Sequence, residues 1–313
     1  MSAADRRDAA TTSAEAPATP PAEGSRVAAG PPPTAAARPV TWSRALRLLG
    51  SELRLVAGRR RNQMGLLVLA AVPVLMAVAV KLSSPRRRGG GPDLLASITS
   101  NGLFVPLAAL SVEIGLFLPL AIAMLSGDAI AGEANTGTLR YLLTVPVGRT
   151  RLLVTKYVSL CIGALWGVAV IVVPGGLVGI AIFGTGPMLT LSGTQLPFWT
   201  AVWRIVLISL YLAAGLAALA AVGLFISTLT EQPLAATVAL TIFTILSWIA
   251  DAVPQIDWLH PWLLVDRWMA FVDLLRDPPF TDTVWQGLGV DLGYAVVFWL
   301  LAWARFAGKD IPN

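Results

Sequence analysis

The sequence predicts an all-α polytopic membrane protein with six transmembrane helices. Of its 313 residues, 56% are hydrophobic and only 13% are charged, whereas soluble domains carry about 25% charged residues. The mean hydropathy is +0.71. Apolar intervals of roughly 20 residues, the length that crosses a bilayer as a helix, recur along the chain. So few charged side chains cannot cover a water-soluble body of 33.0 kDa, and we therefore expect lipid around most of the surface.

The first segment, residues 1–40, is predicted to be a disordered tail. It is rich in Ala, Pro, Ser and Thr and has almost no large apolar side chains, so it cannot bury a core. It also lacks the continuous apolar run of a cleavable secretion signal, which places the amino terminus in the cytoplasm.

Residues 41–62 are predicted to form an amphipathic helix at the membrane surface. Apolar residues recur at intervals of four and three and so lie along one helical stripe; they are Trp42, Leu46, Leu49, Leu53 and Val56. Arginines lie off this stripe, as is typical of a helix that rests on a lipid interface. A helix packed on a soluble partner is the alternative interpretation.

Residues 63–313 are predicted to form one six-helix domain. The spans are expected at about 64–82, 103–125, 157–183, 205–227, 233–252 and 285–304. Two of them enclose an acid, Glu113 in the second and Asp291 in the sixth. An ionised group near the middle of a span costs on the order of 3 kcal/mol, so Glu113 should face protein or water. A place on a translocation path and a structural role, with Ser111 as a neighbour, both stay open, and Asp291 is expected to pair with Arg204.

Six crossings would leave both termini in the cytoplasm, and the charge distribution favours that topology. Basic residues are concentrated in the segments expected inside, as the positive-inside rule requires. The basic cluster at 86–88 falls on the predicted outer side and departs from this rule. The loop after the fifth span is acidic and rich in tryptophan, so we expect residues 254–285 to form short helices at the outer interface or re-entering the membrane.

The segment 128–149, after the second span, carries the strongest functional signal. It is too polar for lipid and contains the helix-stopping residues Asn135 and Gly137, a short leucine-rich turn, and Pro146. The pattern predicts a compact helix-turn-helix projection at the cytoplasmic membrane edge. Such a projection is suited to docking a cytosolic partner.

This segment resembles the signature of the permease subunits of ATP-binding-cassette (ABC) transporters, in the type-two exporter class. The resemblance rests on Asp128, Glu133, Gly137-Thr138-Leu139-Arg140, Leu142-Leu143, Pro146, Arg149 and Lys156. The family also has an amphipathic elbow helix before the first span, here Trp42 to Val56, and a Phe and Asp-Ile ending, here Phe306 and Asp310-Ile311. The similarity covers about residues 41–313.

The resemblance implies a permease that forms a path for an exported drug, antibiotic, lipid or similar cargo. A coupling helix between the second and third spans would rest on a separate cytosolic ABC ATPase, which would bind ATP and Mg. A second permease copy or a paralogue would complete the path in the plasma membrane. The coupling residues implied are Asp128, Glu133, Gly137, Thr138, Leu139 and Arg140, and Glu113 would lie on the path.

Several other chemistries are excluded by residues that the chain lacks. A phosphate-binding loop needs Gly-x4-Gly-Lys followed by Ser or Thr, but the only Gly-Lys pair, Gly308-Lys309, precedes Asp310. We therefore expect no ATP hydrolysis, and no enzyme activity, from this chain itself. The single Cys161 and single His260 exclude a disulfide framework and make a metal site unexpected. Basic residues lie near helix ends, which disfavours nucleic acid as a partner.

Two alternatives to the permease interpretation were weighed. A secondary transporter would use Glu113 as a proton or cation site, although such folds often contain internal repeats and no convincing repeat is found. A polytopic membrane enzyme would have to use His260 with a Ser and an Asp, but no motif surrounds that histidine. The enzyme interpretation therefore ranks last.

Overall fold

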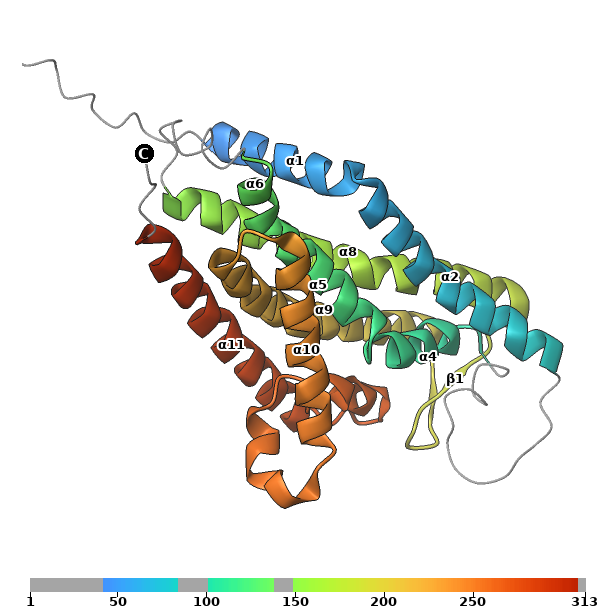
Figure 1. Cartoon of the computed structure of the whole chain (residues 1–313). Coiled ribbons are helices and arrows are strands. Elements are labelled where there is room, and N and C mark those ends of the chain that lie inside the picture. Colours follow the sequence, from blue (N-terminus) through green and yellow to red (C-terminus); the bar gives the residue numbers. More distant parts are fainter. Residues whose placement is uncertain (1–41, 84–100, 138–148, 309–313) are drawn as a thin grey trace, which may run out of the picture. The chain divides into compact units, whose positions relative to one another are not determined.

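The computed structural model describes residues 42–83, 101–137 and 149–308 (Figure 1). Four predictions lie outside these residues. They concern the tail at 1–40, the basic cluster at 86–88, the ending Asp310-Ile311, and the stretch from Thr138 through Leu139 and Arg140 to Pro146.

Helices make up nearly all of the described structure. The α-helices are α1 (Trp42–Gly58), α2 (Arg60–Ser83), α4 (Phe104–Glu113), α5 (Phe117–Ala129), α6 (Ala131–Asn135), α8 (Arg149–Phe183), α9 (Phe198–Leu229), α10 (Pro233–Asp251) and α11 (Asp282–Ala307). Two 3-10 helices, η1 (Pro254–Trp262) and η2 (Trp268–Leu275), lie between α10 and α11. Strands β1 (Met188–Leu189) and β2 (Gln195–Leu196) pair antiparallel in the loop between α8 and α9.

Five of these helices are long and apolar enough to cross a membrane, and the number rises to six if the bent pair α4 and α5 is counted as one span. The five are α2, α8, α9, α10 and α11. The prediction of a helical, polytopic membrane protein is therefore confirmed. Within residues 254–285, where short helices were predicted, the chain forms η1 and η2, and α11 begins at Asp282.

The second span, expected over 103–125, consists of two helices in the structure. α4 ends at Glu113, α5 begins at Phe117, and the two axes are bent by 60°. Leu116, with φ −146° and ψ −54°, lies outside helical geometry. Gly115 weakens the helix here, and Pro119, which has no N–H to donate to a preceding carbonyl, lies in the first turn of α5, where no such bond is needed.

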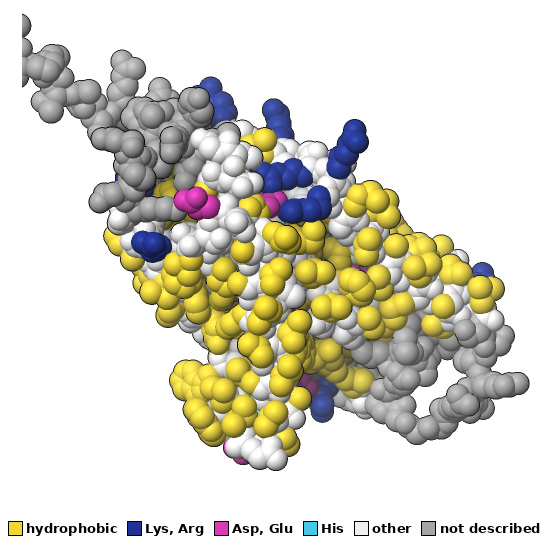
Figure 2. All heavy atoms as spheres, in the orientation of Figure 1, with side chains coloured by type: hydrophobic (Ala, Val, Ile, Leu, Met, Phe, Trp, Pro, Cys, Tyr) yellow, Lys and Arg dark blue, Asp and Glu magenta, His cyan; other side chains and the backbone are white. Residues whose placement is uncertain are grey.

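α9 is the central helix of the domain at 41–313. Its apolar window is 67% buried, compared with 17% for α2 and for α11. It contacts α5, α8, α10 and α11, and the small residues between Ala213 and Ala221 allow these neighbours to approach closely. The peripheral helices expose Leu, Val and Ile outward, and Figure 2 shows these side chains as a yellow surface. This surface suits a lipid environment.

Charge separates the two ends of the helical domain. We call the end that holds α1, the starts of α2 and α8, and the end of α11 the basic end; in the described part of the chain it includes Arg47, Arg54, Arg59, Arg60, Arg61, Arg149, Arg151, Lys156 and Arg305. Figure 2 shows dark blue side chains over α1 and the start of α2. Arg149 Nη1 donates to Ala307 O at 2.7 Å, which joins α8 to α11 there. The opposite end, with η1 and η2, is rich in aspartate.

One close helix contact gives a first testable prediction. A Cβ atom on Gly179 of α8 would overlap the carbonyl oxygen of Gly102, just before α4, whereas a Cβ on Gly176 would meet nothing within 4 Å. We expect Gly179→Ala to lower stability by about 1–3 kcal/mol, because the obstructing atom belongs to backbone. Gly176→Ala, the matched control, should leave the melting temperature of the detergent-solubilised protein unchanged or slightly raised. Equal melting temperatures for the two variants would contradict this packing.

Candidate functional site

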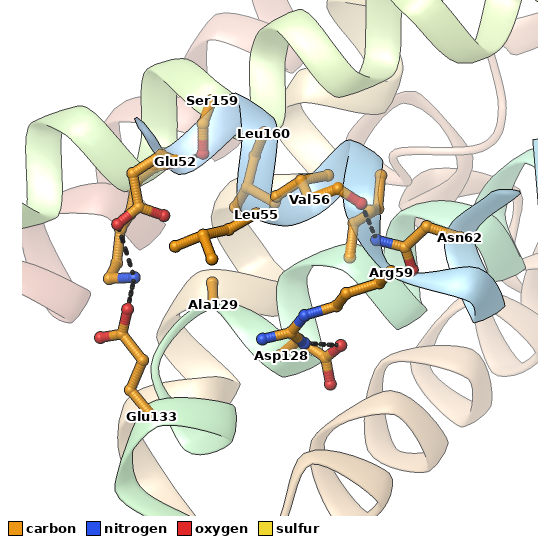
Figure 3. Close-up of a pocket in the computed structure, with 12 residues that line it drawn as sticks. Glu52, Leu55, Val56, Arg59, Asn62, Asp128, Ala129, Glu133, Ser159 and Leu160 are labelled. Atoms are coloured by element: carbon orange, nitrogen blue, oxygen red, sulfur yellow. Dashed lines mark hydrogen bonds and ion pairs between the residues drawn. The ribbon is translucent and has the colours of Figure 1, made fainter. Parts of the chain in front are cut away.

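A buried lysine near the start of α8 joins three helices at the basic end. Lys156 Nζ lies 2.5 Å from Glu133 Oε1 of α6 and 3.5 Å from Glu52 Oε1 of α1. Figure 3 shows the carboxylates of Glu52 and Glu133 converging on this point. The Lys156 side chain is only 4% exposed, and a buried ammonium is stable only when it is paired. α1, α6 and α8 are therefore held together by one cation.

A second set of ion pairs holds the end of α5. Asp128 Oδ2 lies 2.5 Å from Arg59 Nη1, at the corner between α1 and α2, and also accepts a hydrogen bond from Arg61. Asp128 is 12% exposed and both arginines are 46% exposed. Each exposed pair contributes little energy by itself, but together they fix the end of α5 against the start of α2. We call Glu52, Arg59, Arg61, Asp128, Glu133 and Lys156 the charged cluster.

The cavity beside the charged cluster is too small for a ligand. It has a volume of about 40 Å³ and is lined by Leu55, Val56 and Asn62 together with members of the cluster (Figure 3). This is room for about one or two water molecules. Asn62 Nδ2 donates to Val56 O at 2.8 Å and so satisfies a carbonyl near the end of α1. The arrangement can transmit force between helices but offers no binding pocket.

α9 supports the same region through one serine. Ser227 Oγ accepts hydrogen bonds from Ile130 N and Ala131 N at 3.1 and 2.9 Å, and it donates to Gly127 O at 3.0 Å. These are backbone groups at the junction of α5 and α6 that have no helical partner of their own. The central helix is thus bonded directly to the start of α6.

α6 ends as the sequence predicts. Gly137 has φ +72°, a left-handed conformation that favours glycine and commonly terminates helices. Thr136 Oγ1 donates to Gly132 O at 3.0 Å.

Burial raises the pKa of the Glu133 carboxyl, although Lys156 acts in the opposite direction. The ion pair with Lys156 therefore offsets part of the cost of burying this carboxyl.

The structure thus locates three of the predicted coupling residues. Asp128 and Glu133 face the chain's own basic residues, and Gly137 is exposed at the end of α6. The sequence analysis did not identify Glu52 of α1 as a member of this cluster, and it did not identify Glu52 and Glu133 as the partners of Lys156. The available signals were an acid within the arginine-rich α1 and a lysine entering an otherwise apolar helix.

Glu113 lies apart from the charged cluster, at the break between α4 and α5. Its side chain is fully buried, and neither carboxylate oxygen has a hydrogen-bond partner among the described residues. Ser111, the expected neighbour, donates instead to Leu107 O at 2.7 Å within α4. An unpartnered buried acid is costly, so this position carries a functional hypothesis.

The predicted pair between Arg204 and Asp291 is wrong. Arg204 Nη1 donates to Leu274 O at 2.6 Å and to Arg276 O at 3.0 Å, and Nη2 lies 3.9 Å from Asp277 Oδ1. The arginine therefore binds the free carbonyls at the end of η2. Asp291 is buried in α11, and a Cβ atom on Gly215 would lie 3.5 Å from its Oδ2.

The single histidine and the single cysteine are not part of the charged cluster. A ring nitrogen of His260 lies 3.2 Å from Val253 O, and Cys161 is a half-buried free thiol in α8. Within the described residues, no group of three or more potential metal ligands occurs.

Two similarities to known proteins accompany this geometry. A family model described as a protein of unknown function, DUF2705, matches residues 96–312. The probable ABC transporter permease protein NosY of Pseudomonas aeruginosa is 30% identical over 126 residues, which are 39% of this chain and 38% of that protein. The matched part is thus well under half of either protein.

Proposed function

The chain belongs to the DUF2705 family, whose description states no function, and we propose that it is the permease subunit of an ABC exporter of the type-two class. A separate cytosolic ABC ATPase supplies the energy, and a second permease copy or a paralogue completes the translocation path. The subunit lies in the plasma membrane with both termini in the cytoplasm.

The observation that carries the proposal is the convergence of α1, α6 and α8 on Lys156. α1 precedes the first span, where the resemblance implies an elbow helix, and α6 begins the segment between the second and third spans, where a coupling helix is expected. The partial similarity to a probable ABC permease supports the same assignment. The basic end faces the cytoplasm in this account, in agreement with the positive-inside rule.

The charged cluster gives the segment after α5 a route to the membrane helices. Pressure from the ATPase on residues after Gly137 reaches α8 through the chain and also through Glu133 and Lys156. Asp128 carries the displacement to α2 by way of Arg59 and Arg61. The helices then change their tilt together, as in other transitions based on rigid elements. In this mechanism Asp128 and Glu133 transmit movement, and the residues that follow them in the chain contact the ATPase.

Glu113 is our proposed polar point on the translocation path. Its unpartnered carboxylate at a helix break could receive a cationic group once the path opens. The same observation is the one that favours the second candidate function, a secondary transporter with a proton or cation site at Glu113. The two are separated by the energy source, since only the exporter requires ATP.

The sidedness of α6 tests the proposal. In a Cys161→Ser background, Asn135→Cys should react with a membrane-impermeant maleimide in inside-out vesicles but not in intact cells. The matched control is Trp258→Cys in η1, where the native side chain is 70% exposed; it should show the reverse pattern. Labelling of Asn135→Cys from outside the cell would rule out contact between this segment and a cytosolic ATPase.

A further inference from the structure

A groove of about 660 Å³ lies between η1 and α11 at the end opposite the charged cluster. Pro261 and Trp262 form one wall, and one face of α11 forms the other. Tyr294 Oη donates to Trp262 O at 3.0 Å and so ties the two walls together. The volume lies in the range of ligand sites, about 300–1,000 Å³.

The groove changes from polar to apolar along its length. Arg267 and Gln286 lie together at its outer end, since a Cβ on Gly287 would lie 3.2 Å from Arg267 Cβ. Val297 and Phe298 line the inner end. From Gln286 to Val297 α11 rises about 16 Å, close to half of the roughly 30 Å hydrocarbon layer. This polarity gradient matches that of one lipid molecule, with its headgroup at the membrane boundary.

The guanidinium of Arg267 keeps hydrogen-bonding capacity for an anion. Its Nε is buried and forms an ion pair with Asp266 Oδ2 at 3.4 Å. The side chain is still 23% exposed and lines the groove, so its exposed part can meet an anion there. Burial, reinforced by Asp251 and opposed by Arg267, raises the pKa of Asp266. Tyr211 Oη donates to Arg267 O at 2.5 Å and fixes the backbone of the arginine.

The described residues do not fill the groove. A Cβ atom on Gly289 or on Gly293 of α11 would meet nothing within 4 Å, and Trp262 is 69% exposed. A helix from a second copy would cover the exposed part of the Arg267 guanidinium with apolar surface unless it also brought an anion. Removing that part from water is costly, because the described ion pair with Asp266 involves Nε alone. A phosphate headgroup supplies that anion directly.

We propose that this groove binds one anionic phospholipid, with an acyl chain along α11 and its phosphate at Arg267. The proposal requires insertion in a membrane but does not depend on coupling to an ATPase. The lipid-binding proposal and the proposed exporter function can therefore fail independently of each other.

Native mass spectrometry of the full-length protein in detergent tests the proposal, with phosphatidylglycerol and phosphatidylcholine of identical acyl chains as probes. We expect the wild-type protein to prefer phosphatidylglycerol and Arg267→Gln to lose about tenfold in affinity for it, as expected for a lost charge-assisted hydrogen bond. Arg276→Gln is the matched control, because Arg276 lies at the same end, is 55% exposed and pairs with Asp273. It should retain the preference.

Gly293→Leu supplies an independent variant that fills open space in the groove and should weaken the binding of both lipids. Equal binding of the two lipids by the wild-type protein, or an unchanged preference in Arg267→Gln, would overturn the proposal. So would displacement of the lipid by inorganic phosphate, which would identify a simple anion site. Loss of a dimer in Gly293→Leu with lipid binding intact would instead assign the groove to an interface between copies.

Discussion

Replacing Lys156 with methionine should destabilise the protein by about 3–5 kcal/mol, the usual cost of removing one partner from a buried ion pair. Methionine is similar in length but leaves the carboxylates of Glu133 and Glu52 without their cation. These side chains are only 15% and 12% exposed, so water cannot fully replace the lysine. The measurement is the apparent melting temperature of the purified protein in one detergent, followed by size-exclusion chromatography after heating.

Two further variants separate the ion pair from the loss of a positive charge. Arg60→Met removes a basic residue that is exposed at the same end and should leave the melting temperature nearly unchanged. The triple variant Lys156→Met with Glu52→Gln and Glu133→Gln removes the whole charged group and should recover much of the stability, because no charge remains buried without a partner. If Lys156→Met alone has the same melting temperature as the wild-type protein, Lys156 does not hold the three helices together.

Asp128→Asn should reduce the stimulation of ATP hydrolysis by the permease severalfold while the ATPase still co-purifies. The substitution keeps the side-chain shape but removes the charge that Arg59 and Arg61 share. The end of α5 then loses its attachment to the start of α2, so movement of the segment reaches fewer spans. The residues after Gly137, which we propose contact the ATPase, are unchanged, which is why binding should survive.

The control for Asp128→Asn is Asp257→Asn, an identical change of charge at an exposed position of η1. It should leave both ATPase binding and stimulation at the wild-type level. Hydrolysis measured on complexes with matched ATPase content distinguishes loss of coupling from loss of assembly. Full stimulation by Asp128→Asn would exclude Asp128 from the proposed route.

The membrane helices could be predicted from the sequence because lipid imposes a simple rule on composition. Charge-free intervals mark α2, α8, α9 and α10, whatever their neighbours. The same rule hid the break at Glu113, since Gly115 and Pro119 lie within an apolar run that hydropathy treats as continuous. The break follows from the backbone conformations that Gly115 and Pro119 favour, and hydropathy carries no information on backbone conformation.

The ion pairs were harder to predict than the helices. Glu52 and Lys156 meet only because α1 packs on α8, and sequence spacing does not encode which helices are neighbours. Arg204 and Asp291 were paired by charge alone, yet Arg204 binds carbonyls at the end of η2. The motif that begins at Asp128 drew attention to Asp128 and Glu133 but gave no information on which way their side chains point.

The central claim is that the basic end passes the work of a cytosolic ATPase to the membrane helices. Its most direct test is to purify the full chain from its host membranes, reconstitute it in lipid nanodiscs with the ATPase that co-elutes, and measure ATP hydrolysis. The account predicts a tightly associated ATPase whose rate rises in the presence of the wild-type chain and rises much less with Asp128→Asn. A chain that recruits no ATPase, or whose cargo flux follows an ion gradient without ATP, would contradict it.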